Sequence, residues 1–173
     1  ERAKVLASEI LNYGRPVRTA VQDMRISNGC ADTDISFENN EVSGYTNGTN
    51  TSCQVFNPAG GDVTYIAPIA DILDSEFEGE FSYGNLYFNG SNEIVGVGTT
   101  CGDISCMDLV MFIPYVKEEV CRAINESLGV TSAGDAVPSE GVIAFWPGEE
   151  FDGVYGASTI DMATGDDAPA LAN

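Results

Sequence analysis

The chain has 173 residues, a hydrophobic content of 43% and a net charge of −20. This length allows a single domain with a real core, and the ordinary apolar content argues against a disordered chain despite the charge. No apolar run approaches the roughly 20 residues that cross a bilayer, and the acidity excludes nucleic acid as a ligand of the main body.

Charge is distributed unevenly along the sequence. Residues 1–25 hold five of the seven basic residues and three acidic ones, a net of +2. The remaining residues carry two basic and 24 acidic groups, a net of −22. Such a body repels anionic lipid headgroups as well as nucleic acid.

The first segment predicts an amphipathic helix, because its apolar residues recur at steps of three and four. Gly14 and Pro16 interrupt the pattern and predict a kink, or two abutting helices with Pro16 in the first turn of the second. Asn28-Gly29 predicts the end of the helix. Residues 1–29 are therefore expected to form a stalk-like helix, and 30–173 an acidic α+β head. The apolar stripe of the helix comprises Leu6, Ile10, Tyr13, Val17, Val21 and Met24.

In the head, residues 30–61 are expected to form mostly ordered loop, with short strands at 35–37 and 53–56. Further strands are expected at 63–69, 81–88 and 94–97, separated by Gly and Asn turns that suit an antiparallel meander. An apolar stretch at 107–115 precedes a helix over 116–128, which Gly129 ends, and a last strand at 142–146 precedes a tail without an evident terminal element. The predicted fold is α+β: a kinked N-terminal helix packed on a small antiparallel sheet, with one further helix and disulfide-braced loops.

Five cysteines could be buried thiols, metal ligands or disulfides. Zinc is the weakest of these, because the chain lacks histidine and only Cys101 and Cys106 lie close together. Disulfides are favoured and imply export to the periplasm or the cell exterior. We predict that Cys30 pairs with Cys53 and Cys101 with Cys106, each closing a loop rich in turn residues, which leaves Cys121 unpaired.

Catalytic signals are missing. Without histidine the commonest general base is absent, and no nucleophile elbow, phosphate loop or dinucleotide fingerprint occurs. Because 27 acidic residues always offer some carboxylate pair, that pattern is uninformative, and we predict no catalytic residues and no enzyme.

Acidic clusters raise the question of calcium. They lie at Asp32 and Asp34, at 38–41 and at 166–167, and none matches a twelve-residue calcium loop. A solvated acidic surface is the favoured interpretation, so we predict no cofactor and no metal site; a structural calcium is the alternative. Four Asn-x-Ser/Thr triplets are weak indications of a eukaryotic secretory origin, and begin at Asn47, Asn50, Asn89 and Asn125.

Several strings resemble the soluble part of a type IV pilin or pseudopilin, and more narrowly an uncharacterised group of bacterial pilin-like proteins. They are NGCADTDISFENN, SGYTN, VFNPAGGDVTY and LVMFIPYVKEEVCRAIN. In that family a peptidase trims a leader, and an apolar half-helix anchors the subunit in the membrane and later packs in the filament core. That half-helix is absent from this sequence.

The resemblance implies a non-enzymatic, exported filament or secretion-machine subunit. Its partners would be other pilin-like subunits, and it would meet the membrane only through the missing N-terminal segment. It would be anchored in the inner membrane before assembly, then periplasmic or extracellular. Relatives continue past the equivalent of Asn173 into another cysteine, which would explain an unpaired Cys121.

Two hypotheses follow. In the first, the chain acts by assembly and surface presentation, and its assembly face is formed by Leu6, Ile10, Tyr13 and Val17. The alternative is an exported adhesin or carbohydrate-binding module, calcium-assisted, that uses the loops between Cys30 and Gly61. Assembly needs part of the stripe free, so it predicts that Leu6 and Ile10 are exposed and that burial rises toward Gly29, whereas a solitary binder buries the whole stripe. A plain amphipathic helix packed on its own domain is the remaining interpretation of the helix.

Overall fold

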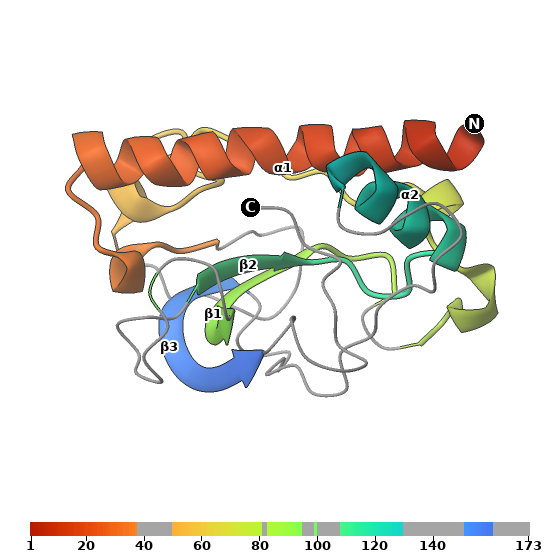
Figure 1. Ribbon diagram of the computed structural model, residues 1–173. Coiled ribbons are helices and arrows are strands. Elements are labelled where there is room, and N and C mark those ends of the chain that lie inside the picture. Colours follow the sequence, from red (N-terminus) through yellow and green to blue (C-terminus); the bar gives the residue numbers. More distant parts are fainter. Residues whose placement is uncertain (38–49, 81–82, 95–98, 100–107, 130–150, 161–173) are drawn as a thin grey trace.

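The computed structural model describes residues 1–37, 50–80, 83–94, 99, 108–129 and 151–160. The long helix α1 (Arg2–Ser27) lies along one side of the molecule, above a layer formed by a three-stranded sheet and a second helix, α2 (Glu118–Leu128) (Figure 1). The arrangement is a small α+β fold, as the sequence predicts. Within the described residues, no helix combines the length and the apolar content that a membrane span requires.

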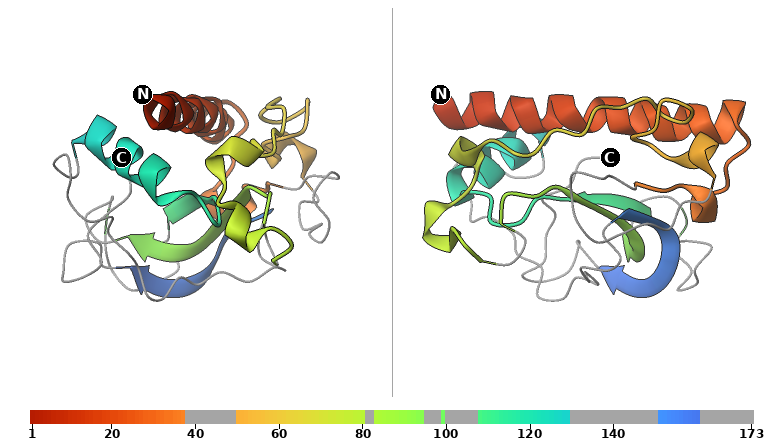
Figure 2. Two further views of the ribbon diagram at one scale, coloured as in Figure 1. Left: turned by 90° about the vertical axis from the view of Figure 1, so that its right-hand side faces the viewer. Right: turned by 180° about the vertical axis from the view of Figure 1, so that it is seen from behind.

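Helix α1 is a single helix, so the prediction of a break at Pro16 is wrong. Its ribbon shows no sharp bend along its whole length (Figures 1 and 2). Proline removes one amide donor, which leaves the carbonyl of Asn12 without its helical partner. Both residues lie on the exposed side of α1, where water can satisfy that carbonyl. Buried residues on either side, such as Ile10 and Val17, hold both halves of the helix on the head.

The end of α1 agrees with the prediction. Asn28 closes the helix, and Gly29 follows with a φ of +68°, a conformation that glycine adopts at little cost. The amide of Cys30 then donates to the carbonyl of Met24. The chain therefore turns back toward the head directly after the helix.

The sheet has the strand order β2-β1-β3. Strands β1 (Tyr87–Ile94) and β2 (Asp108–Phe112) pair antiparallel, as a meander requires. Strand β3 (Phe151–Ile160) pairs parallel to β1, so the prediction of a wholly antiparallel sheet is wrong. The strand lies in the tail, where we expected no element, so that expectation is wrong as well.

Strand β1 also differs from its predicted bounds. The sequence Asn89-Gly90 predicts a turn, but β1 runs through it, and its register with β2 shifts between Asn89 and Asn92. Pairing with strands on both sides keeps the chain extended, and the irregularity takes the form of a bulge.

Segment 63–69 is extended without belonging to the sheet. It runs beside α1 (Figure 2), and the amide of Ile66 donates to the hydroxyl oxygen of Tyr13, with 3.2 Å between the two atoms. The predicted strand is therefore a strap along the helix. The short segments expected at 35–37 and 53–56 do meet, through a parallel bridge between Ser36 and Gln54. The strand expected at 142–146 lies outside the described residues.

Two apolar clusters hold the layers together. Under the C-terminal half of α1, the stacked rings of Phe37 and Phe88, with centroids 4.7 Å apart, form the centre of the larger cluster. Under the N-terminal half, Leu6 and Ile10 pack with Val120 of α2 and with the turn at Ile72-Leu73. Full burial of an aliphatic side chain stabilises a fold by about 1.5–3 kcal/mol, so the second cluster ties the whole first half of α1 to the head.

Candidate functional site

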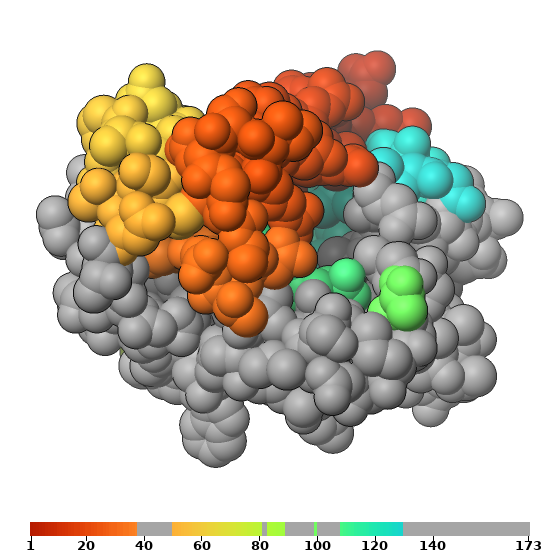
Figure 3. Space-filling model, turned by 90° about the vertical axis from the view of Figure 1, so that its left-hand side faces the viewer, coloured from red at the N-terminus to blue at the C-terminus, as the bar shows by residue number. Residues whose placement is uncertain are grey.

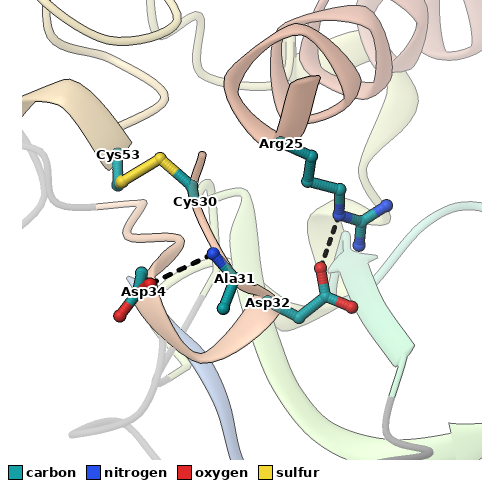
Figure 4. Close-up of polar contacts among 6 residues, drawn as sticks. All are labelled: Arg25, Cys30, Ala31, Asp32, Asp34 and Cys53. Atoms are coloured by element: carbon teal, nitrogen blue, oxygen red, sulfur yellow. Dashed lines mark hydrogen bonds and ion pairs between the residues drawn. A yellow bond between two sulfur atoms is a disulfide. The ribbon is translucent and has the colours of Figure 1, made fainter. Parts of the chain in front are cut away.

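The disulfide between Cys30 and Cys53 confirms the predicted pairing. Its Cα atoms lie 5.9 Å apart, and both residues are buried. The bridge joins the residue that follows the end of α1 to the short 3-10 helix η2 (Thr51–Cys53) (Figure 4). It therefore fixes the C-terminal end of α1 to the head covalently.

Polar contacts reinforce the same corner. Arg25 of α1 forms an ion pair with Asp32, and the amide of Ala31 donates to the carboxylate of Asp34 (Figure 4). The side-chain amide of Asn28 donates to the carbonyl of Ser52. Both carboxylates of the Asp32/Asp34 cluster thus have protein partners.

The described residues contain no cluster of side chains that could bind calcium. Among the described ranges, no group of three or more Cys, Asp and Glu side chains is placed to hold a metal ion. The other acidic runs considered for calcium, 38–41 and 166–167, lie outside these ranges.

Cys121 is a free cysteine in the first half of α2, and it is half-buried. Burial raises the pKa of its thiol, and the neighbouring carboxylate of Glu118 acts in the same direction. The reactive thiolate is therefore scarce at neutral pH, which makes Cys121 a weak nucleophile. Cys101 and Cys106 lie outside the described residues, so their predicted pairing stays a prediction.

The predicted assembly face does not lie free. Leu6, Ile10 and Val17 are all buried, with exposed fractions of 6%, 8% and 7%, and Tyr13 is partly buried beneath the strap at 63–69. The expectation that Leu6 and Ile10 are exposed, with burial rising toward Gly29, is therefore wrong. The physical reason is that α2 and the turn at Ile72-Leu73 extend the apolar surface of the head beneath the first turns of the helix.

The opposite side of α1 is exposed along its whole length. Val5 and Ile26, near its two ends, retain 58% and 83% of their accessible surface. Three arginines, at positions 15, 18 and 25, are separated by three and seven residues and so share one edge of the helix. We call Arg15, Arg18 and Arg25 the arginine row. The spacing of these arginines in the sequence already indicates the row, which was not among the predicted site residues.

A second charged feature lies at the other end of the molecule. The segment Asp74 to Glu80 forms a turn around the 3-10 helix η4 (Ser75–Phe77), and it contains four acidic residues and no basic one. The ring of Phe77 is 41% exposed and stacks on Tyr115, with centroids 4.9 Å apart. We call this segment the acidic lobe; its carboxylates belong to Asp74, Glu76, Glu78 and Glu80.

Tyr115 supports the lobe from below. It has a φ of +59°, which is uncommon for a residue with a side chain, and its carbonyl accepts a hydrogen bond from the amide of Asp74. These contacts hold the tyrosine ring against Phe77. The lobe is therefore a supported surface in which the partly exposed Phe77 lies in a segment with four acidic residues.

Asn125 is a third feature that the sequence did not reveal. It lies in α2 with no exposed surface, and among the residues that the structure describes neither polar atom of its side chain has a hydrogen-bond partner. It also begins one of the four Asn-x-Ser/Thr triplets, but a wholly buried amide is closed to glycosylation in the folded chain. This triplet therefore gives no support to a glycosylated protein.

Comparison with protein-family models, with curated proteins and with solved structures gave no significant match for this chain. The resemblance to pilins thus gains no support from these comparisons, and the function has to be inferred from the residues of the chain itself.

Proposed function

We propose that this chain is a non-enzymatic, exported subunit that acts by assembly, with α1 as the element that meets neighbouring subunits. The observation that supports this most directly is the exposed side of α1, which extends over a helix of 26 residues and ends in the apolar side chains of Val5 and Ile26. A helix that packs on one side and is free on the other can serve as a contact between subunits. The head would be the part that the assembly presents.

Export is supported by the disulfide. Bridges such as Cys30–Cys53 persist in the periplasm and outside the cell, whereas the cytosol keeps thiols reduced. The acidic composition fits the same compartments, because a strong net charge keeps an exposed domain soluble. Both features agree with a filament or secretion-machine subunit of the pilin or pseudopilin kind.

The contact between subunits must differ from the apolar stripe. Because Leu6 and Ile10 are part of the core, a neighbour can reach only the outer side of α1, unless the helix detaches. The pilin-like form of the proposal also requires an apolar segment before Glu1, which would continue the helix and provide membrane anchoring before assembly.

The second candidate is an exported binding module, an adhesin or a carbohydrate binder. Burial of the whole stripe favours it, since a domain that works alone leaves no long apolar face free. Part of the loop region that such a module would use, residues 38–49, lies outside the described residues.

Photo-crosslinking tests the proposal. A photoreactive amino acid is introduced at Thr19, which is exposed on the outer side of α1, and the oxidised chain is irradiated over a range of concentrations. Covalent dimers and larger species, together with faster sedimentation as concentration rises, are expected for an assembling subunit. A chain that stays monomeric at every concentration up to millimolar would overturn the proposal in favour of the binding module.

A further inference from the structure

Most of the positive charge of the arginine row is not neutralised by an ion pair with another described residue. Arg25 is paired with Asp32, and Arg15 makes one weak hydrogen bond, 3.3 Å long, to the side-chain oxygen of Asn12. Arg18 has no salt bridge within the described part of the chain. All three residues are exposed. The C-terminal half of α1, to which they belong, lies at the surface of the molecule in the view of Figure 3.

The acidic lobe carries negative charge that is likewise not neutralised by an ion pair with another described residue. Across the described ranges, none of its four carboxylates forms a salt bridge, and all except that of Asp74 belong to exposed residues. The exposed ring of Phe77 adds a surface that suits a guanidinium group, because arginine stacks on aromatic rings while it donates to carboxylates. Lysine, a compact point charge, would fit such a surface less well.

The two features cannot meet within one molecule. The chain just before the lobe lies beside the first half of α1, because the turn at Ile72-Leu73 packs in the same buried cluster as Leu6. The arginine row occupies the second half of the helix. Figure 1 shows η4 near the N-terminal end of α1, with the C-terminal end of the helix at the opposite side. A helix of this length extends about 39 Å at 1.5 Å per residue. The arginine row and the acidic lobe therefore do not contact each other within one molecule, and a contact between them has to join two molecules.

We infer that the arginine row of one copy docks on the acidic lobe of the next, with a guanidinium group against the exposed face of Phe77. This inference rests on the proposed function, since it names the partner and the contact of the assembling subunit. The contact joins two different surfaces, so it is head-to-tail, and it produces open chains unless the rotation between copies closes a ring.

Net charge gives this contact a distinctive dependence on salt. Two copies at −20 repel each other in dilute buffer, and this long-range repulsion weakens once the Debye length falls to about 8–10 Å. The attraction between the arginine row and the acidic lobe acts over a shorter distance, so it weakens only at higher salt concentrations. Self-association is therefore strongest at intermediate ionic strength and declines on both sides.

The test is a charge swap, measured by sedimentation equilibrium of the full chain at about 0.15 M salt. Arg15→Gln/Arg18→Gln removes two charges from the row, and Lys4→Gln/Ser8→Glu changes the net charge equally at exposed positions outside it. The first double variant is expected to weaken self-association by about tenfold or more, and the second by less than about twofold.

Complementation makes the assignment specific. Arg15→Glu/Arg18→Glu gives a chain with two acidic ends. Glu76→Lys/Glu78→Lys/Glu80→Lys leaves only the carboxylate of Asp74 in the lobe, so it gives a chain with two basic ends. Neither variant is expected to associate with itself. A mixture of the two is expected to associate, because acidic and basic surfaces again face each other. Circular dichroism and thermal melting confirm that each variant is folded before the measurement.

The outcomes separate this inference from the proposed function. If the parent chain associates and both reversal variants still associate like it, the contact lies elsewhere: the head-to-tail inference fails, while assembly stands. If the parent chain stays monomeric at every salt concentration, assembly itself fails. Binding of the lobe to a different basic protein, with no binding between copies, would also overturn the inference.

Discussion

Leu6, in the second turn of α1, packs in the same buried cluster as Val120 of α2. The contact means that the first half of the helix is part of the core and does not stand free of the head. The neighbouring residue Val5 provides a matched control for substitutions of Leu6, because Val5 is 58% exposed whereas Leu6 is 6% exposed.

Leu6→Glu is expected to lower the free energy of unfolding by more than about 3 kcal/mol, because it removes a buried aliphatic side chain and buries a carboxylate. Val5→Glu, its matched control, is expected to change it by less than about 0.5 kcal/mol. Urea unfolding followed by circular dichroism measures both. Equal, small effects would show that the stripe is free, as the original assembly face required.

Non-reducing peptide mapping is expected to recover Cys30 linked to Cys53, with Cys121 outside that bridge. Replacing both bridged residues by alanine should lower the free energy of unfolding by about 2–4 kcal/mol, since the bridge closes a loop in the unfolded chain. Cys121→Ala serves as the control for loss of a cysteine. A map that joined Cys30 to Cys101 would contradict the structure.

Tyr13 predicts a loss of stability at alkaline pH. Burial raises the pKa of its phenol above the ordinary value of 10.0, so the unfolded chain releases this proton before the folded chain does. The contribution of Tyr13 to the free energy of unfolding is complete below about pH 10, and it is lost as the pH rises from there through the higher pKa of the folded state. Free energies of unfolding measured between pH 8 and about 11.5 should decline less steeply for Tyr13→Phe. Identical slopes for the two proteins would rule out this contribution.

Asn125 is a buried residue whose replacement by an apolar residue is not expected to lower the free energy of unfolding. Its buried amide has no hydrogen-bond partner among the described residues, and leaving such a group unpaired costs about 1–3 kcal/mol. Asn125→Leu is therefore expected to leave the free energy of unfolding unchanged or to raise it, although most core substitutions lower it. A large loss would mean that the amide has a polar partner after all, which hydrogen exchange or a crystal structure with ordered water would identify.

Local signals in the sequence predicted local structure well. Gly29 and Gly129 end their helices with positive φ, and the spacing of apolar residues located both helices. The pairing of Cys30 with Cys53 followed from a loop rich in turn residues. These features depend on residues that are close in sequence or on backbone conformations that one residue type favours.

Features that depend on distant partners were not predicted. The signal at Asn89-Gly90 indicated a turn, but pairing with β2 and β3 keeps that segment in a strand. Residues 63–69 have a strand-like composition, yet they lie beside α1, where the backbone amide of Ile66 donates to the side-chain hydroxyl of Tyr13. The burial of Leu6 depends on α2, which lies more than a hundred residues away in the sequence, and no pattern within α1 reveals that contact.

The two ends of α1 are attached to the head in different ways, and this gives the molecule a mechanical direction. Beyond its C-terminal end, Cys30 is held by a covalent bond, whereas the N-terminal end is held by the ion pair between Arg2 and Asp71 and by apolar packing. A pulling force applied at Glu1 would therefore peel the helix from its first turn onward and stop at the disulfide. Load would pass through that bridge into the head, and the apolar stripe would be uncovered progressively from its N-terminal end.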